Sequence, residues 1–200
     1  MKIVLATWNK SKQKWLKEGL RSLPFPILTL EHDQYKHISD VEETGDTCEA
    51  NALLKARTIP NDGQSIIIGE DSGLFIQALG HFPGVKTARW MDGTDDDRAA
   101  KILKDMTDIS ERDAYFQSAL AAIFPDGDSI VVEAKLPGKI ARKSRGDQDT
   151  GYSQIFELAH GQTIAEMEPE AFERNDHRRM AIAKLKTSIE EKMHEHTNEY

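Results

Sequence analysis

The sequence predicts a single mixed α/β domain spanning residues 1–200, and three observations lead to this prediction. The 200 residues are 38% hydrophobic, which supplies one sizeable core. Short β-rich runs alternate with segments in which apolar side chains recur at helical spacing. No motif repeats at a period of about 20 to 50 residues, which argues against repeat architectures.

The first half of the chain is predicted to alternate strands with helices. Pro24 ends the first helix, and Asp46 is expected to cap the second, with Glu49 completing a capping box. Asn51 and Lys55 share one face of that second helix. The predicted elements are a strand at 2–7, a helix that ends before residue 24, a strand at 27–30, a helix at 46–57, and a strand at 65–69 that breaks at 70–73 and resumes at 74–76.

The second half is predicted to place a hairpin between two helices. The turn-forming residues 125–128 separate two apolar runs, which indicates the hairpin. Residues 139–142 are expected to add an edge strand. The predicted elements are a helix at 96–106, strands at 114–124 and 129–134, and a final helix that carries Ile182, Leu185, Ile189 and Met193 on one face before a flexible tail at 194–200.

Charge and composition exclude several classes of protein. The formal net charge of −8 gives no general attraction to nucleic acids or membrane surfaces, so an anionic ligand needs a local basic pocket. The apolar runs, such as 119–124, are far shorter than the roughly 20 residues of a membrane span. The apolar stretch at 3–6 is too brief for a signal peptide, which predicts a cytoplasmic protein. Cys48 is the only cysteine, which excludes an internal disulfide and leaves a lone nucleophile without a supporting motif.

Acidic side chains gather beside glycines and helix starts. Carboxylates of this kind suit Mg²⁺, which commonly binds one or two of them together with substrate phosphates. The alternative is that Glu42 and Glu43 are solvated and that Glu49 only caps its helix. Glu70 and Asp71 directly follow an isoleucine run, where they would be poorly hydrated unless something binds them.

Basic side chains fall at loops and helix starts, where they could hold a polyphosphate with the help of helix N-terminal amides. Lys10, Lys12, Lys55, His177 and Arg178 form this set. Ordinary solvated lysines are the alternative for Lys10 and Lys12. The sequence has neither GxxxxGK[ST] nor GxGxxG, which argues against the common ATPase and dinucleotide-binding sites.

Taken in order, a series of short motifs resembles the Ham1-like inosine/xanthosine triphosphate pyrophosphatase family over almost the full length of the chain. The motifs are LATWNKSK at 5–12, EETG at 42–45, EANALLKAR at 49–57, EDSGL at 70–74, ALG at 78–80, PGV at 83–85, TAR at 87–89, GY at 151–152, AEM at 165–167 and HR at 177–178.

This resemblance implies an elongated, two-lobed α/β fold with a central cleft, and a homodimer. It also implies hydrolysis of a nucleoside triphosphate between the α and β phosphates with Mg²⁺, by default ITP, dITP or XTP, to the monophosphate and pyrophosphate. The implied catalytic residues are Asp71, Glu43 and Lys55, and Glu43, Asp71 and Glu70 are the implied metal ligands. The implied substrate-binding residues are Thr7, Trp8, Asn9, Lys12, Ser72, Tyr152, Gln162, His177 and Arg178.

The chain departs from the family pattern mainly at the base-recognition motifs. Thr150 stands where the family has a stacking phenylalanine, Ser153 where it has an aspartate, and Gln162 where it has a lysine. Asp176 replaces a serine, and Trp8 replaces a glycine. The Trp8 ring could stack on a base, which is worth about 1 to 3 kcal/mol, or could pack within the protein. These changes predict an altered or relaxed choice of base.

Two other function classes stay open beside the nucleotide diphosphatase. One is a nucleotide-binding protein that has lost catalysis, marked by Ser153, Gln162 and Asp176. The other is a phosphatase that acts on a different phosphorylated metabolite and releases orthophosphate.

Overall fold

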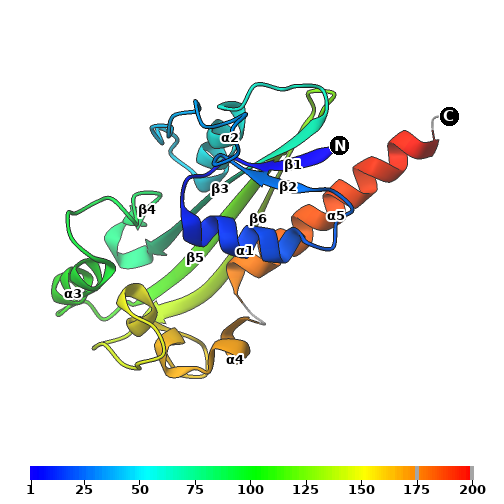
Figure 1. Ribbon diagram of the computed structural model, residues 1–200. Coiled ribbons are helices and arrows are strands. Elements are labelled where there is room, and N and C mark those ends of the chain that lie inside the picture. Colours follow the sequence, from blue (N-terminus) through cyan, green and yellow to red (C-terminus); the bar gives the residue numbers. More distant parts are fainter. Residues whose placement is uncertain (174–175, 199–200) are drawn as a thin grey trace. The chain divides into compact units, whose positions relative to one another are not determined.

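The computed structural model describes residues 1–173 and 176–198, and the chain divides into two compact units. The first unit comprises Met1–Asp71, Ser118–Ala134 and the chain from Arg178 onward, and the second comprises Ser72–Gln117 and Lys135–His177. Within the described residues the strands form one seven-stranded mixed sheet in the order β2-β1-β3-β5-β6-β7, with β4 paired to β3 (Figure 1).

Helices and strands alternate in the first half of the chain, and consecutive strands occur in the second half, which fits the predicted mixed α/β class. The strands are β1 (Lys2–Leu5), β2 (Ile27–Thr29), β3 (Ser65–Ile76), β4 (Pro83–Gly84), β5 (Asp113–Ile123), β6 (Ser129–Ile140) and β7 (Phe156–Glu157). The helices are α1 (Lys10–Leu20), α2 (Cys48–Arg57), α3 (Asp95–Asp105), α4 (Pro169–Glu173) and α5 (His177–Asn198), with short 3₁₀ turns at Gln77–Leu79, Gly151–Gln154 and Ile164–Glu166.

The first unit is built in three layers around β1 and β3, which pair in parallel with Ile3 opposite Ile66. Alternate side chains of a strand point to opposite faces of the sheet. Ile3 and Ile66 pack with α1 and α5 on one face, whereas Val4 and Ile67 pack with α2 on the other (Figure 1). Both faces of these strands are therefore buried, and the predicted apolar face of α5 lies in the core.

The start of α2 corrects one prediction. Thr47, and not Asp46, caps the helix, and its hydroxyl accepts a hydrogen bond of 3.1 Å from the N–H of Ala50. Glu49 lies in the first turn and does not complete a capping box with Asp46. The negative charge of Glu49 in the first turn still stabilises the helix, because it interacts favourably with the helix dipole.

The continuity of β3 corrects a second prediction, because the strand does not break at residues 70–73. Glu70 and Asp71 lie in the middle of a twelve-residue strand. Just before them, Gly69 lies directly under α2, where a Cβ atom would be 2.0 Å from the carbonyl oxygen of Ala52. Only glycine allows the helix backbone to approach the strand so closely.

The second unit has its own apolar core, formed by the end of β3, α3, β5, β6 and the segment from 152 to 164. Strand β6 runs without interruption to Ile140, so the predicted separate edge strand at 139–142 is wrong. Pro137 is tolerated within it because β7 pairs only with Lys139 and Ile140. A capping box of Thr94 and Asp97 starts α3.

Helix α5 continues to Asn198, and residues 199–200 lie outside the described part of the chain. The flexible tail predicted for 194–200 stays a prediction. None of the helices described is both long enough and apolar enough to span a bilayer.

Candidate active site

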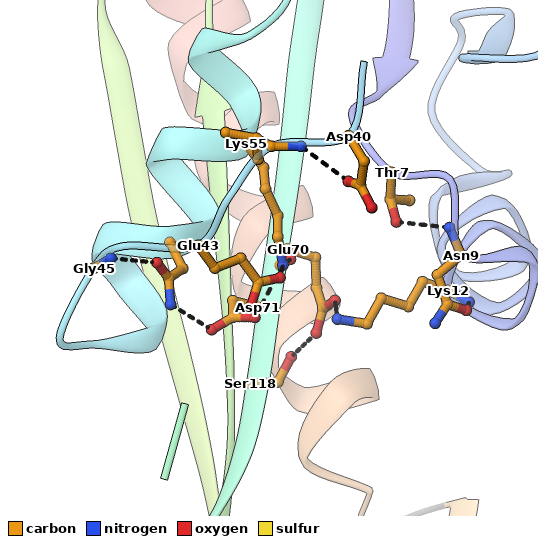
Figure 2. A network of polar contacts seen from close by, with 12 residues as sticks. Thr7, Asn9, Lys12, Asp40, Glu43, Gly45, Lys55, Glu70, Asp71 and Ser118 are labelled. Carbon is orange, nitrogen blue, oxygen red and sulfur yellow. Dashed lines mark hydrogen bonds and ion pairs between the residues drawn. The ribbon is translucent and has the colours of Figure 1, made fainter. Parts of the chain in front are cut away.

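Two neighbouring carboxylates in β3 form the centre of the candidate site. Glu70 is 0% exposed and Asp71 is 2% exposed. As adjacent strand residues they point to opposite faces, Glu70 toward Lys12 of α1 and Asp71 toward Lys55 of α2. Each carboxylate meets its own lysine, which compensates its burial (Figure 2).

Lys55 of α2 is the cation on the Asp71 side. Its ammonium donates to Asp71 Oδ1 at 2.9 Å and to the carbonyl oxygen of Glu70 at 2.9 Å, and it also forms an ion pair with Glu43 (Figure 2). The predicted helix face that carries Asn51 and Lys55 is thus turned toward β3. Glu43 comes from the loop before α2, so three segments of the chain meet at one ammonium group.

These charges change one another's proton affinity. Burial raises the pKa of Asp71, and although Lys55 acts against this rise, the nearby Glu43 carboxylate adds to it. Burial lowers the pKa of Lys55, but the carboxylates of Asp71 and Glu43 outweigh burial, so the net change is upward. Asp71 is therefore a stronger base than a surface aspartate, beside an ammonium that stays charged.

Lys12 of α1 is the cation on the Glu70 side, with its Nζ 2.7 Å from Glu70 Oε2. The hydroxyl of Ser118 lies 3.4 Å from Glu70 Oε1 as a donor. Burial opposes the charge of Glu70, but Lys12, Lys55 and Arg178 outweigh it and lower the pKa of this carboxyl. Glu70 is thus held as a carboxylate although its side chain is fully buried.

The loop between β1 and α1 is ordered by its own polar groups. Thr7 accepts a hydrogen bond of 3.2 Å from the N–H of Asn9, and the Asn9 side chain caps α1 by accepting from the N–H of Lys12. Trp8 donates from its indole N–H to the carbonyl oxygen of Ile38 at 3.2 Å and packs against an apolar cluster of the first unit. This contact supports the packing alternative for Trp8.

The other predicted substrate residues, Ser72, Tyr152, Gln162 and His177, belong to the second unit. The Tyr152 hydroxyl donates to the carbonyl oxygen of Thr87 at 2.7 Å and accepts from Trp90 at 3.0 Å.

Gln162 is exposed, and its backbone carbonyl accepts from the N–H of Leu158. His177 is buried, stacks on Phe116, and has its Nδ1 3.1 Å from Asp176. Their roles toward a base stay predictions.

The structure gives no support to Cys48 as a nucleophile. The thiol is fully buried in α2. Burial raises its pKa, and the charge of Asp71 raises it further, so the thiol stays protonated.

Three contributors to the site carry no predicted role. Asn51 donates to Asp71 Oδ2 at 3.2 Å, and the Ser118 hydroxyl donates to Glu70. Gly69 lets the backbone of α2 lie close to β3. For Gly69 a signal exists, because an isolated glycine in a β-branched run indicates a close backbone approach. Nothing in the local pattern around Ser118 links it to Glu70, which lies 48 residues away.

The sequence is similar to those of several known proteins. The model of the Ham1 family matches residues 3–188. The chain is 42% identical over 193 residues to a "Non-canonical purine NTP pyrophosphatase homolog" of Halalkalibacterium halodurans, covering 95% of this chain and 96% of the relative. It is 37% identical over 185 residues to a "dITP/XTP pyrophosphatase" of Symbiobacterium thermophilum, covering 92% of each chain.

Solved structures show the same fold. A HAM1 protein from Coxiella burnetii matches with a TM-score of 0.85 and 33% identity, covering 96% of this chain and 99% of that chain. A dITP/XTP pyrophosphatase from Mycobacterium abscessus matches with a TM-score of 0.78 and 36% identity, covering 92% and 97% of the two chains. Sequence and fold agree over nearly the whole length, and the chain belongs to the Ham1 family.

Proposed function

We propose that this protein hydrolyses non-standard purine nucleoside triphosphates, with ITP, dITP and XTP as default substrates, to the nucleoside monophosphate and pyrophosphate. The observation that carries the proposal is the buried Asp71, held between the ammonium of Lys55 and the amide of Asn51. The names of the relatives, which include dITP/XTP pyrophosphatase, support the substrate class.

In the proposed reaction, water attacks the α-phosphorus while its proton passes to the carboxylate of Asp71. The bond between the α-phosphorus and the oxygen that bridges to the β-phosphorus breaks, and pyrophosphate leaves with that electron pair. Burial raises the pKa of Asp71, which suits a general base. Lys12 and Lys55 supply positive charge that stabilises the phosphates as negative charge builds on the leaving group.

The side chains fit a magnesium ion. Glu43 and Asp71 already converge on one positive charge, the ammonium of Lys55, and carboxylate oxygens are the ligands that Mg²⁺ prefers. In the described residues no group of three or more His, Cys, Asp or Glu side chains forms a metal cage. This suits an ion that takes its other ligands from phosphate and water. When bound, the ion would neutralise phosphate charge and polarise the phosphorus.

Glu43 and Asp71 would hold the metal directly, whereas Glu70, which points to the opposite face of β3, would assist only through its charge. The remaining parts of the proposal are a homodimer, a cytoplasmic location, and binding of the triphosphate by the loop from Thr7 to Lys12. Family resemblance supports the homodimer, and a lone, buried Cys48 accords with a reducing compartment. Light scattering coupled to size-exclusion chromatography tests the oligomeric state.

The test is hydrolysis of a panel of ribo- and deoxynucleoside triphosphates with Mg²⁺, with and without added inorganic pyrophosphatase. Phosphate that is detected only with the coupling enzyme establishes cleavage between the α and β phosphates. Orthophosphate without the coupling enzyme indicates a phosphatase, and binding without turnover indicates a catalytically decayed nucleotide-binding protein. The best substrate identifies the base that the altered motifs at 150–154 and 162 accept.

We expect Asp71→Asn to lower kcat by about 10² to 10⁴-fold, because the amide cannot accept the proton. Asp62→Asn is the matched control, since Asp62 lies in the same unit and its described contacts are with Lys2, Gln64 and Ser65, none of which belongs to the site. Its kcat should stay near that of the wild type. A folded Asp71→Asn protein with nearly normal turnover would refute the role of Asp71.

A further inference from the structure

Asn51 of α2 is a fully buried polar residue that joins the two segments carrying the site's carboxylates. Its Oδ1 accepts from the N–H of Gly45 at 2.8 Å, and its Nδ2 donates to Asp71 Oδ2 at 3.2 Å. Both bonds can be followed from Gly45 and from Asp71 in Figure 2. Gly45 lies only two residues after Glu43.

The chemistry of the two partners fixes the orientation of the amide. A backbone N–H can only donate, and an ionised carboxylate can only accept, so the amide oxygen must face Gly45 and the amide nitrogen must face Asp71. The reversed orientation would bring the amide NH₂ against the N–H of Gly45 and the amide oxygen against the carboxylate of Asp71, and both contacts are repulsive. With Lys55 on Oδ1 and Asn51 on Oδ2, both oxygens of Asp71 have a donor, and the carboxylate is fixed in rotation.

The loop needs glycine to make its part of this contact. A Cβ atom on Gly45 would lie 2.7 Å from Asn51 Oδ1 and 2.9 Å from the Cβ atom of Ala50. An alanine there would push the loop away from α2, whereas the bond from Asn51 to Asp71 could remain. The two halves of the contact can therefore be broken separately.

Helix formation does not require an asparagine at this position. An interior asparagine is less favourable in a helix than alanine by about half a kcal/mol. Residue 51 is 0% exposed and has no solvent role. The two hydrogen bonds of the side chain, to Gly45 and to Asp71, explain why an asparagine occupies this position.

We propose that Asn51 is a positioning residue that sets the separation between Glu43 and Asp71, so that the two carboxylates can share one divalent cation. This inference rests on the proposed function for its catalytic part, but its metal-binding part can be measured without turnover. Residues that hold metal ligands in place commonly contribute about 10- to 100-fold to affinity or activity.

The experiment compares the wild type with Asn51→Leu, Gly45→Ala and the control Asn61→Leu. Asn61 donates to the carbonyl oxygens of Phe124 and Pro125 in the same unit, so its replacement also removes amide hydrogen bonds, but away from the carboxylates. Three quantities are measured for each protein: Mn²⁺ affinity without nucleotide by electron paramagnetic resonance, kcat and KM for pyrophosphate release, and the circular dichroism melting curve.

We expect Asn51→Leu to weaken Mn²⁺ binding by about 10- to 100-fold and to lower kcat by a similar factor, with KM for the nucleotide changed by less than about threefold. Gly45→Ala should weaken Mn²⁺ binding by about tenfold, yet regain nearly normal kcat at saturating Mg²⁺, because Asp71 keeps its amide donor. Asn61→Leu should lower the melting temperature and change neither Mn²⁺ affinity nor kcat.

The proposal is overturned if folded Asn51→Leu keeps Mn²⁺ affinity within twofold of the wild type. If Asn51→Leu does not fold, Gly45→Ala decides, and unchanged Mn²⁺ affinity in that variant overturns the proposal. If the wild type hydrolyses no triphosphate, the proposed function fails, while the Mn²⁺ measurement still tests the role of Asn51.

Discussion

Replacement of Lys12 by methionine tests the charge balance around the buried carboxylate of Glu70. Lys12 Nζ lies 2.7 Å from Glu70 Oε2, and the Glu70 side chain is 0% exposed, whereas that of Lys12 is 22% exposed. Removal of one partner from a buried ion pair typically costs about 3 to 5 kcal/mol, because the other charge is left without compensation.

The remaining neighbours reduce this cost. Ser118 still donates to Glu70, and the charges of Lys55 and Arg178 still favour its ionised form. The partial exposure of Lys12 also lowers the value of the pair through solvent screening. We therefore expect Lys12→Met to lower the free energy of unfolding by about 2 to 3 kcal/mol at pH 7, which for a chain of this size is about 5 to 10 °C in melting temperature.

The pH dependence of this stability difference shows whether the lost ion pair with Glu70 is its cause. The folded protein lowers the pKa of Glu70 below the ordinary value of 4.5. Its stabilising contribution is therefore fully present above about pH 4.5 and is lost as pH falls through the lower folded value. The stability gap between the wild type and Lys12→Met should be constant near neutral pH and should close as Glu70 becomes protonated in acid.

The assay is urea denaturation followed by circular dichroism from about pH 2 to pH 8, which includes the acid range in which Glu70 becomes protonated. Lys14→Met is the matched control, because Lys14 lies on the same helix and is exposed. Its effect should be within about 0.5 kcal/mol. The double variant Lys12→Met/Glu70→Gln should recover part of the loss, since no buried charge remains. Equal stability of Lys12→Met and Lys14→Met, or a gap that does not change in acid, would refute the reasoning.

Two further predictions concern packing and alkaline pH. Gly69→Ala places a Cβ atom 2.0 Å from the carbonyl oxygen of Ala52, so we expect a loss of about 3 kcal/mol in the melting assay and a reduced kcat as α2 shifts. Gly127→Ala is the turnover control: a Cβ atom there meets nothing within 4 Å, and although its φ of +92° strains an alanine and lowers stability, kcat should stay unchanged. Burial raises the pKa of Tyr152 from 10.0 to about 12, so its contribution to stability is present below pH 10 and should fall by about 2 to 3 kcal/mol between pH 10 and pH 12. Urea titrations over this range should show the decrease in the wild type and not in Tyr152→Phe. An equal decrease in both proteins would contradict the role of Tyr152.

The parts of the fold that the sequence predicts best are those with a strong local pattern. The apolar face of α5, the hairpin between β5 and β6, and the shared face of Asn51 and Lys55 follow from periodicity and turn residues alone. The poor hydration expected for Glu70 and Asp71 is also confirmed, because both are buried against lysines.

The errors at β3 and β6 have a common physical origin, since in both cases a contact made elsewhere in the chain decides a local choice. Asp71 and Glu70 break the β pattern locally, yet β3 continues because lysines from two helices compensate their charges. The strands predicted at 129–134 and 139–142 are one strand, which continues through Pro137 because the neighbouring β7 pairs only with Lys139 and Ile140 and needs no N–H from the proline. Local propensity does not contain this information.

The opposite orientation of Glu70 and Asp71 makes strand register a determinant of chemistry. Because side chains alternate along β3, a slip of one residue relative to β1 would present Asp71 to α1 and Glu70 to α2, with every residue of the site still present in the sequence. A single-residue insertion between Ser65 and Gly69 would therefore exchange the partners of the two carboxylates. The isoleucines of β3, which never touch a nucleotide in this scheme, thus decide which acid serves as the base.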